Sequence, residues 1–216
     1  MATKQKEKVK IEITPPNFQI LPVRVEGTAP LMLHKFSEKM RKQIEEKQTA
    51  KDSTRAKRPP KDYAAEFDAA RYKAQSGGWD GIPAGAFRAA MIAACRRVDG
   101  LPMTQAKGAF FIIADGRDVT DGTPLIKIEG KAVHDTRPVR LESGVADLRN
   151  RPRYDLWACN LKIQFDADLL SANDVANLLA RAGATVGVGE LRPQGPNSYG
   201  GDFGMWAVTS YKKVKQ

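Results

Sequence analysis

The chain has 216 residues, 42% of them hydrophobic, which is enough for one large domain or two small ones with a buried core. No apolar run approaches the roughly 18 residues of a membrane span, the first residues lack the apolar core of a secretory signal, and two cysteines exclude a disulfide framework or a cysteine-based zinc site. The net charge of +10, with a pI of about 9.6, favours a polyanionic partner, nucleic acid before an acidic membrane surface, over the alternative of a solvated lysine-rich surface.

The first expected element is a strand over residues 18–27, FQILPVRVEG, followed by a turn and an apolar stretch to Phe36. A charged insertion then covers residues 37–80. Between Glu38 and Asp62 it holds nine Lys/Arg against five acids and few apolar residues. We expect a weakly held helix over 37–49, a mobile loop over 50–62, and a short helix over 63–74 with Phe67 and Tyr72 facing inward.

The segment PAGAFRAAMIAACRR predicts a helix that begins at Pro83, because proline is well placed in a first helical turn. Its buried face is expected to hold Phe87, Met91, Ala94, Cys95 and Val98. Strands are expected over 109–113 and 124–130, and residues 131–141 either continue the sheet or form a hairpin. In the segment 155–165, DLWACNLKIQF, the odd-numbered residues are apolar and are expected to face the core.

A second helix is expected from Ser171, a good N-cap, with Asp174 in the first turn, where the helix terminus favours negative charge. Its apolar stripe ends at Ala182, and Gly183 is the expected stop. A last strand is expected over 205–211. Without the insertions this order is βαββαβ, which indicates an α+β fold of the ferredoxin-like or RRM-like type. Such a split βαβ arrangement has an antiparallel sheet with two helices on one face.

Two further segments carry binding signals. Residues 137–153 hold five arginines, no lysine and two acids, and the guanidinium group binds phosphate through two parallel hydrogen bonds and stacks on bases. Residues 182–206 hold seven glycines and two prolines around Arg192. Such a loop can cradle a phosphate chain with backbone amides and the guanidinium, or it can be a tight structural turn between a helix and the last strand.

Three segments together resemble the RAMP superfamily. EGTAPLMLHKF (26–36) resembles its first-strand segment, and GIPAGAFRAAMIAACRR (81–97) resembles its I-P-G-S-S-L-(R/K)-G element at Ile82, Pro83, Phe87 and Arg88. The segment 186–206 resembles its C-terminal glycine-rich loop. The serine pair of the second element is absent here, since Ala84, Gly85 and Ala86 occupy that region.

The resemblance implies a ferredoxin-like fold with a long insertion after the first strand, as in the backbone and guide-processing subunits of CRISPR effector complexes. We expect one domain over residues 1–216, with 37–80 as the charged insertion and 131–154 as a basic hairpin or loop. The implied partners are single-stranded nucleic acid, RNA in particular, and copies of the chain or other subunits, in the cytoplasm of a bacterial, archaeal or phage-infected cell. No membrane, cofactor or metal is implied.

The expected nucleic-acid interface combines the basic clusters with the positions that match the superfamily. It consists of Lys35, Arg88, Arg96, Arg97, Arg137, Arg140, Arg149, Arg151, Arg153, Gly187, Gly189, Arg192 and Tyr199. Phe203 and Trp206 are further aromatic candidates for stacking, although the pattern favours a core position for both.

The sequence assigns no catalytic residue. His34 follows the first strand and could act as a general acid or base, as a histidine often does in guide-processing RAMP nucleases, but a surface or backbone-contact role is the simpler interpretation. Asp52, Asp62, Asp68 and Asp80 lie in the insertion without a motif that selects one. The leading hypothesis is therefore non-catalytic binding. A metal-independent endoribonuclease of the same fold, and a phage structural or accessory protein that contacts DNA or other subunits, remain as alternatives.

Overall fold

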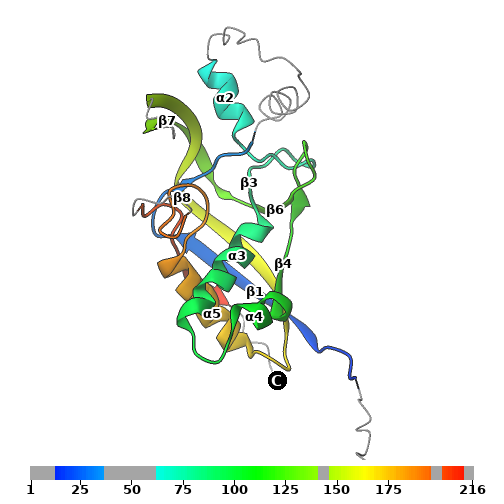
Figure 1. Cartoon of the computed structure of the whole chain (residues 1–216). Coiled ribbons are helices and arrows are strands. Elements are labelled where there is room, and N and C mark those ends of the chain that lie inside the picture. The colour runs from blue at the N-terminus through cyan, green and yellow to red at the C-terminus, as the bar shows by residue number, and fades with distance from the viewer. Residues whose placement is uncertain (1–12, 37–61, 141–145, 196–200, 212–216) are drawn as a thin grey trace, which may run out of the picture.

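The computed structural model describes residues 13–36, 62–140, 146–195 and 201–211 (Figure 1). The fold is α+β, as expected. The main sheet contains β1 (Phe18–Gly27), β4 (Phe110–Ile113), β8 (Ala146–Asp166) and β9 (Trp206–Tyr211) in the spatial order β4-β8-β1-β9, and every neighbouring pair is antiparallel. The short strand β2 (Leu31–Met32) also pairs with β8.

Buried and exposed side chains alternate along the C-terminal half of β8, and this pattern identifies the buried face of the main sheet. Trp157 is 4% exposed, whereas its neighbour Leu156 is 83% exposed. The inward-facing positions continue through Cys159, Leu161, Ile163 and Phe165, and Ile163 lies opposite the buried Leu21 of β1. The prediction for residues 155–165 is therefore confirmed, although the strand is longer than expected.

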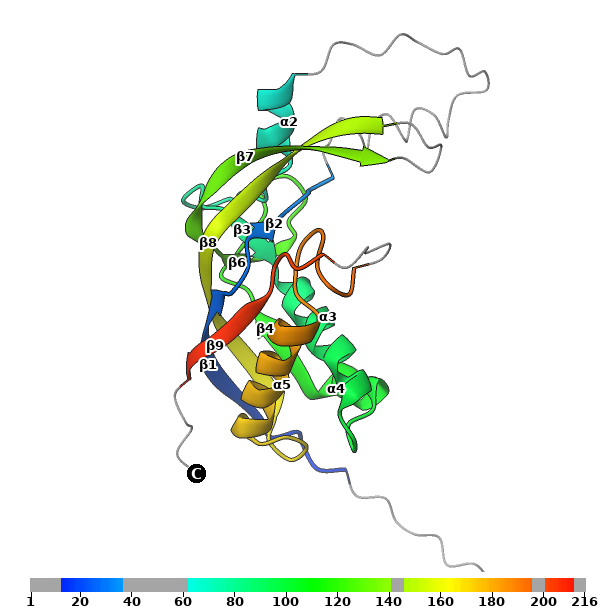
Figure 2. The same ribbon diagram turned by 90° about the vertical axis from the view of Figure 1, so that its left-hand side faces the viewer.

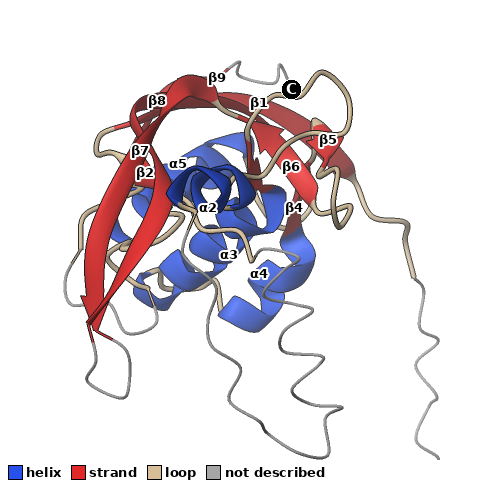
Figure 3. Cartoon of the chain, turned by 90° about the horizontal axis from the view of Figure 1, so that it is seen from above, coloured by secondary structure: helices blue, strands red, loops and turns tan. Residues whose placement is uncertain are grey.

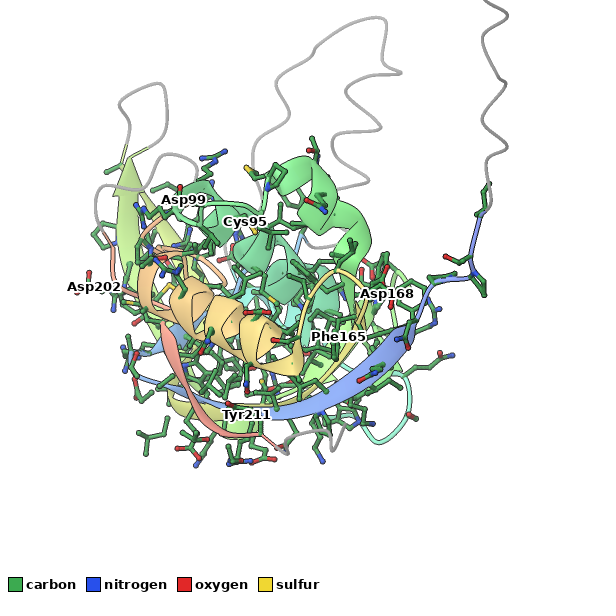
Figure 4. All side chains as sticks on the ribbon, turned by 90° about the horizontal axis from the view of Figure 1, so that it is seen from below. Cys95, Asp99, Phe165, Asp168, Asp202 and Tyr211 are labelled. Atoms are coloured by element: carbon green, nitrogen blue, oxygen red, sulfur yellow. The ribbon has the colours of Figure 1, made fainter. Side chains whose placement is uncertain are left out.

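Helices cover the buried face of this sheet (Figure 3). They are α3 (Ala84–Ala94), which continues as the 3-10 turn Cys95–Arg97, then α4 (Met103–Ala109) and α5 (Ala172–Thr185). Phe87 of α3 meets Trp206 of β9 edge to face, with ring centroids 5.3 Å apart. Figure 4 shows Cys95 among the helices and Tyr211 at the level of the sheet. None of the helices in the described ranges is long and apolar enough to cross a membrane.

Helix α5 begins as predicted but ends later. Ser171 and Asp174 form a reciprocal capping box at its N-terminus. Gly183 is not the stop, because the helix runs on to Thr185 and the first glycine with positive φ after it is Gly187. A Cβ atom on Gly183 would overlap the backbone of Trp206, so this glycine allows β9 to pass close to the helix.

The segment before α3 is less helical than expected. The helix α2 (Tyr63–Ala69) ends before Tyr72, and the chain then forms an isolated bridge between Lys73 and Asp80. A small second sheet follows, with β3 (Gly81–Pro83), β6 (Pro124–Lys127) and β5 (Gly116–Arg117) in the order β3-β6-β5. The helix and the mobile loop expected within 37–61 lie outside the described residues.

The strand β7 (Glu129–Arg140) pairs with the N-terminal half of β8 in a long antiparallel hairpin. Figure 2 shows this hairpin curving away from the main sheet and over the helices, with α2 beside it. The outer part of the hairpin, beyond the pairing of Val133 with Arg153, therefore extends past the main sheet, on the side where residues 186–195 lie.

Candidate functional site

The register of the hairpin brings four of the predicted arginines together. Arg149, Arg151 and Arg153 alternate along β8 and share one face, and Arg137 of β7 lies directly opposite Arg149. Asp135 lies opposite Arg151 on the same face. We call Arg137, Arg149, Arg151 and Arg153 the arginine face. Its members come from two strands, and only the pairing of those strands places them side by side.

Two members of the arginine face are neutralised by a buried carboxylate. Asp135 is 6% exposed and accepts hydrogen bonds from Arg137 at 2.7 Å and from Arg153 at 2.6 Å. Burial alone would raise the pKa of Asp135, but the hydrogen bonds from the two guanidinium groups lower it below its usual value. Arg153 also binds Asp155 at 2.7 Å. Asp135 therefore holds Arg137 and Arg153 in fixed positions.

The other two members keep unused donors. The side chain of Arg149 is half-buried and forms no hydrogen bond or ion pair with any residue that the structure describes. Arg151 is 5% exposed, its Nε has no hydrogen-bond partner, and burial lowers the pKa of its guanidinium. Its nearest acid is Glu190, with 3.7 Å between the nitrogen and the carboxylate oxygen. A buried donor without a partner is costly, so an anionic ligand that reached the Nε of Arg151 would be stabilised there.

The described residues 186–195 of the glycine-rich segment 186–206 lie between the hairpin and α3, where they are drawn in orange (Figure 2). The guanidinium of Arg137 stacks on the ring of Phe203, 4.9 Å from its centroid. Arg151 contacts Glu190 from the same side. The hairpin and this segment therefore form two walls of one site, and the half-buried Phe203 belongs to it instead of to the core. Trp206, in contrast, is 1% exposed and lies in the core as expected.

The glycines of this segment serve the packing of the chain on itself. Gly187, Gly189 and Gly204 have φ values of 73°, 76° and 67°, in the left-handed region that favours glycine. A Cβ atom on Gly189 would overlap the carbonyl of Met32, and one on Gly204 would overlap the backbone of Val188. These contacts support the structural-turn interpretation of the segment.

The backbone amides and Arg192 have partners within the chain as well. The amide of Val188 donates to Gly204 at 2.9 Å, and that of Glu190 donates to Met32 at 2.8 Å. Arg192 donates to the carbonyl of Gly189 at 2.7 Å. The phosphate cradle proposed for this loop thus lacks two of the amides that it would need.

A cavity of about 390 Å³ opens between α3 and the glycine-rich segment. One wall is formed by small side chains of α3, namely Ala86, Ala89, Ala90 and Ala93. The polar groups at its other side come from His34, Glu190, Arg192 and Gln194. His34 has no hydrogen-bond partner among the described residues, and its pKa is lowered by burial and then by the charge of Arg151. The imidazole is therefore neutral near pH 7, with one donor and one acceptor available.

Several predicted site residues lie elsewhere. Lys35 is buried, forms an ion pair with Asp118 and approaches the ring of Tyr72, so it has a structural environment. Arg88 donates to the carbonyl of Phe110 at 3.1 Å and to that of Lys107, which ties α3 to α4 and β4.

The remaining predicted residues are distant from the arginine face or cannot be placed. Arg96 and Arg97 are exposed at the end of α3 that points away from the hairpin (Figure 2). The side chain of Arg140 and the whole of Tyr199 lie outside the described part of the chain.

The sequence interpretation missed Asp135 and Glu190, the two acids that organise the site. Asp135 could have been found from the basic pattern, because an acid two residues from Arg137 in a strand lies on the same face. Glu190 carried no local signal, since its approach to Arg151 depends on tertiary packing. Among the described residues, no cluster of three or more His, Cys, Asp and Glu could hold a metal ion.

Comparisons with known proteins give no further guide to the site. The chain matches no protein-family model, and no curated protein is significantly similar to it in sequence.

Proposed function

We propose that the protein binds single-stranded nucleic acid, RNA in particular, along the arginine face without cleaving it. The observation that carries the proposal is the guanidinium of Arg149, which has no hydrogen bond or ion pair with described residues. It lies on the same strand face as Arg151, whose buried Nε has no hydrogen-bond partner. Arginine is suited to phosphate because its fork matches two phosphate oxygens. Asp135 contributes by holding Arg137 and Arg153 in place at the edges of this positive region.

Phe203 adds a surface on which a base can stack. Its ring lies under Arg137 and is only half-buried. Aromatic rings next to basic groups are typical of sites for single strands, since every base has a face that can stack. A duplex does not present its bases in this way, so the combination favours a single strand.

The fold supports the same proposal. The strands β1, β4, β8 and β9 and the helices α3 and α5 follow one another in the order β1-α3-β4-β8-α5-β9, and the sheet order is β4-β8-β1-β9. We infer a ferredoxin-like arrangement in which the hairpin of β7 and β8 is an addition between the second and third core strands. By resemblance to the RAMP superfamily, the chain would act as a repeated subunit of a ribonucleoprotein assembly.

The proposal is tested by comparing Arg149→Ala with Arg181→Ala. Arg181 is exposed on α5, and its side chain has no hydrogen bond or ion pair with described residues, so it is a matched control for the loss of one charge. Binding of a fluorescently labelled single-stranded RNA is measured by anisotropy. We expect Arg149→Ala to weaken binding on the order of tenfold and Arg181→Ala to change it little. Equal affinities for both variants would contradict the proposal.

A second candidate is a metal-independent endoribonuclease, favoured by the position of His34. Its unpartnered imidazole lines the cavity and lies close enough to Arg151 and Arg149 for their charges to lower its pKa. Cleavage of labelled RNA in the presence of a chelator, abolished in His34→Ala, would support this function. Intact RNA after prolonged incubation with the wild-type protein supports binding alone.

A further inference from the structure

The cavity between α3 and residues 186–194 has the volume of a small-molecule site and a lining that is apolar with a few polar groups. Its volume of about 390 Å³ falls within the usual range of roughly 300–1,000 Å³ for such sites. The wall of alanines offers a flat apolar surface, because none of these side chains extends beyond Cβ. A flat wall with polar groups on one side suits a planar ring whose edge carries hydrogen-bonding groups.

The polar side of the cavity combines a carboxylate with an imidazole. Glu190 lines the cavity, and its 3.7 Å approach to Arg151 leaves oxygen lone pairs unused. His34 lines the same cavity without a hydrogen-bond partner among the described residues. A carboxylate at a site for nucleic acid repels phosphate. Its presence therefore indicates a part of the ligand that donates hydrogen bonds.

We propose that this cavity binds a guanine base, with Glu190 accepting hydrogen bonds from its Watson–Crick edge and His34 contacting its remaining polar atoms. Guanine presents two adjacent donors, N1–H and N2–H, which match the two oxygens of a carboxylate. Adenine and cytosine present one amino group next to an acceptor, and uracil presents one N–H between two carbonyls. Only guanine therefore satisfies both oxygens of Glu190 without opposing a lone pair.

The base can come from two sources. In a bound single strand, a guanine would leave the stack and enter the cavity while the phosphates lie on the arginine face, and this version rests on the proposed function. A free guanine nucleotide has the same base chemistry and needs no strand. The proximity of Glu190 to Arg151 joins the cavity to the arginine face, so a single nucleotide could reach both.

Two variants test the cavity, each with a control. Glu190→Gln replaces one acceptor oxygen by a donor, and Asp99→Asn makes the same chemical change at an exposed acid without a described partner (Figure 4). Ala89→Leu fills the mouth of the cavity from an exposed position on α3 and keeps a good helix former there. Thermal melting verifies that each variant is folded.

The first measurement is calorimetric titration with GMP, AMP, CMP and UMP. The second is anisotropy with an oligoadenylate and with the same strand carrying one guanine. We expect GMP, or the guanine-containing strand, to bind about tenfold or more tighter than its counterparts. Glu190→Gln and Ala89→Leu should abolish this preference, and Asp99→Asn should keep it.

The pattern of results separates the two sources and the two proposals. A preference seen with strands but not with nucleotides assigns the base to a bound strand, and a preference seen with both admits free nucleotides. No guanine preference in either assay, or one that survives in folded Glu190→Gln, would overturn the inference. If Arg149→Ala leaves strand binding unchanged while the preference for GMP persists, the proposed function fails and the guanine site stands.

Discussion

At the scale of single residues, the site depends on how each arginine is compensated. Arg137 and Arg153 share Asp135. Among the described residues, in contrast, no acid pairs with Arg149, and the ion pair of Arg151 with Glu190 is long, at 3.7 Å. Pairing with a buried carboxylate fixes a guanidinium and reduces its attraction for phosphate. Arg149 and Arg151 are therefore the residues on which affinity should depend most, and Asp135 is the residue on which their framework depends.

Asp135→Asn tests this framework. Because the pKa of Asp135 is lowered in the folded state, its carboxylate stabilises the protein above the ordinary pKa of aspartate, and this contribution is lost as pH falls through the lowered value. We expect Asp135→Asn to reduce the free energy of unfolding by about 1–3 kcal/mol at pH 7. The difference from wild type should shrink as pH falls below the ordinary pKa of aspartate and through the lowered pKa of Asp135. Urea titrations at pH 7 and in acid measure the free energy of unfolding of wild type and Asp135→Asn. An equal difference between the two proteins under both conditions would contradict this role of Asp135.

Gly204→Ala tests the structural interpretation of the glycine-rich segment. Gly204 has a φ of 67°, and an added Cβ would overlap the backbone of Val188. We expect a clear loss of thermal stability. Gly85→Ala in α3 is the control, because nothing lies within 4 Å of its Cβ position and alanine favours helix by up to about 1 kcal/mol. Similar melting temperatures for the two variants would show that the backbone at Gly204 can adopt another conformation, and would contradict the structural interpretation.

At the scale of elements, one amide side chain links α2 to the hairpin by a hydrogen bond. Asn150 of β8 is 4% exposed, accepts a hydrogen bond from Thr136 at 2.7 Å, and donates one to Glu66 of α2 at 2.7 Å. The same oxygen lies 3.0 Å from a ring nitrogen of His134, whose imidazole packs on Phe67. Asn150 is thus the centre of the contact between α2 and the hairpin.

Asn150→Ala should release α2 while the main sheet stays folded. The change removes the donor to Glu66 and the acceptor for Thr136, and it leaves the packing of β1, β4, β8 and β9 intact. We expect faster amide hydrogen exchange in residues 63–69 and unchanged exchange in α5. Gln194→Ala is a suitable control, because Gln194 donates to the carbonyl of Thr185 far along the chain from α2. Unchanged exchange in α2 would mean that other contacts hold this helix.

Elements with a strong local pattern were predictable from the sequence. The alternation in β8 and the capping box of α5 depend on neighbouring residues, and both are confirmed. The end of α5 was predicted wrongly because Gly183 serves a contact with Trp206, which is far away in the sequence. Arg137 lies opposite Arg149 because of the register of β7 and β8. Asn150 donates a hydrogen bond to Glu66 of α2, which is distant in the sequence. Neither relation is visible in the local pattern.

At the scale of the whole molecule, the excess of positive charge predicted an anionic partner but not its location. The basic residues are spread over many elements, and some, such as Lys35 and Arg88, are used inside the fold. Only the structure separates the arginines that hold the fold from those with unused donors. The hairpin therefore brings some of the predicted site residues together, and the others lie elsewhere in the fold. The cavity beside the hairpin is lined by three segments that are distant in the sequence.

The salt dependence of RNA binding tests the central claim most directly. Each phosphate contact on a single strand contributes about −0.7 to the slope of log K against log salt. We measure the affinity of wild type, Arg149→Ala and Arg181→Ala for one single-stranded RNA at several salt concentrations. The account predicts a steep slope for wild type and Arg181→Ala, and a slope shallower by about 0.7 for Arg149→Ala. A flat wild-type response, or an unchanged slope in Arg149→Ala, would contradict it.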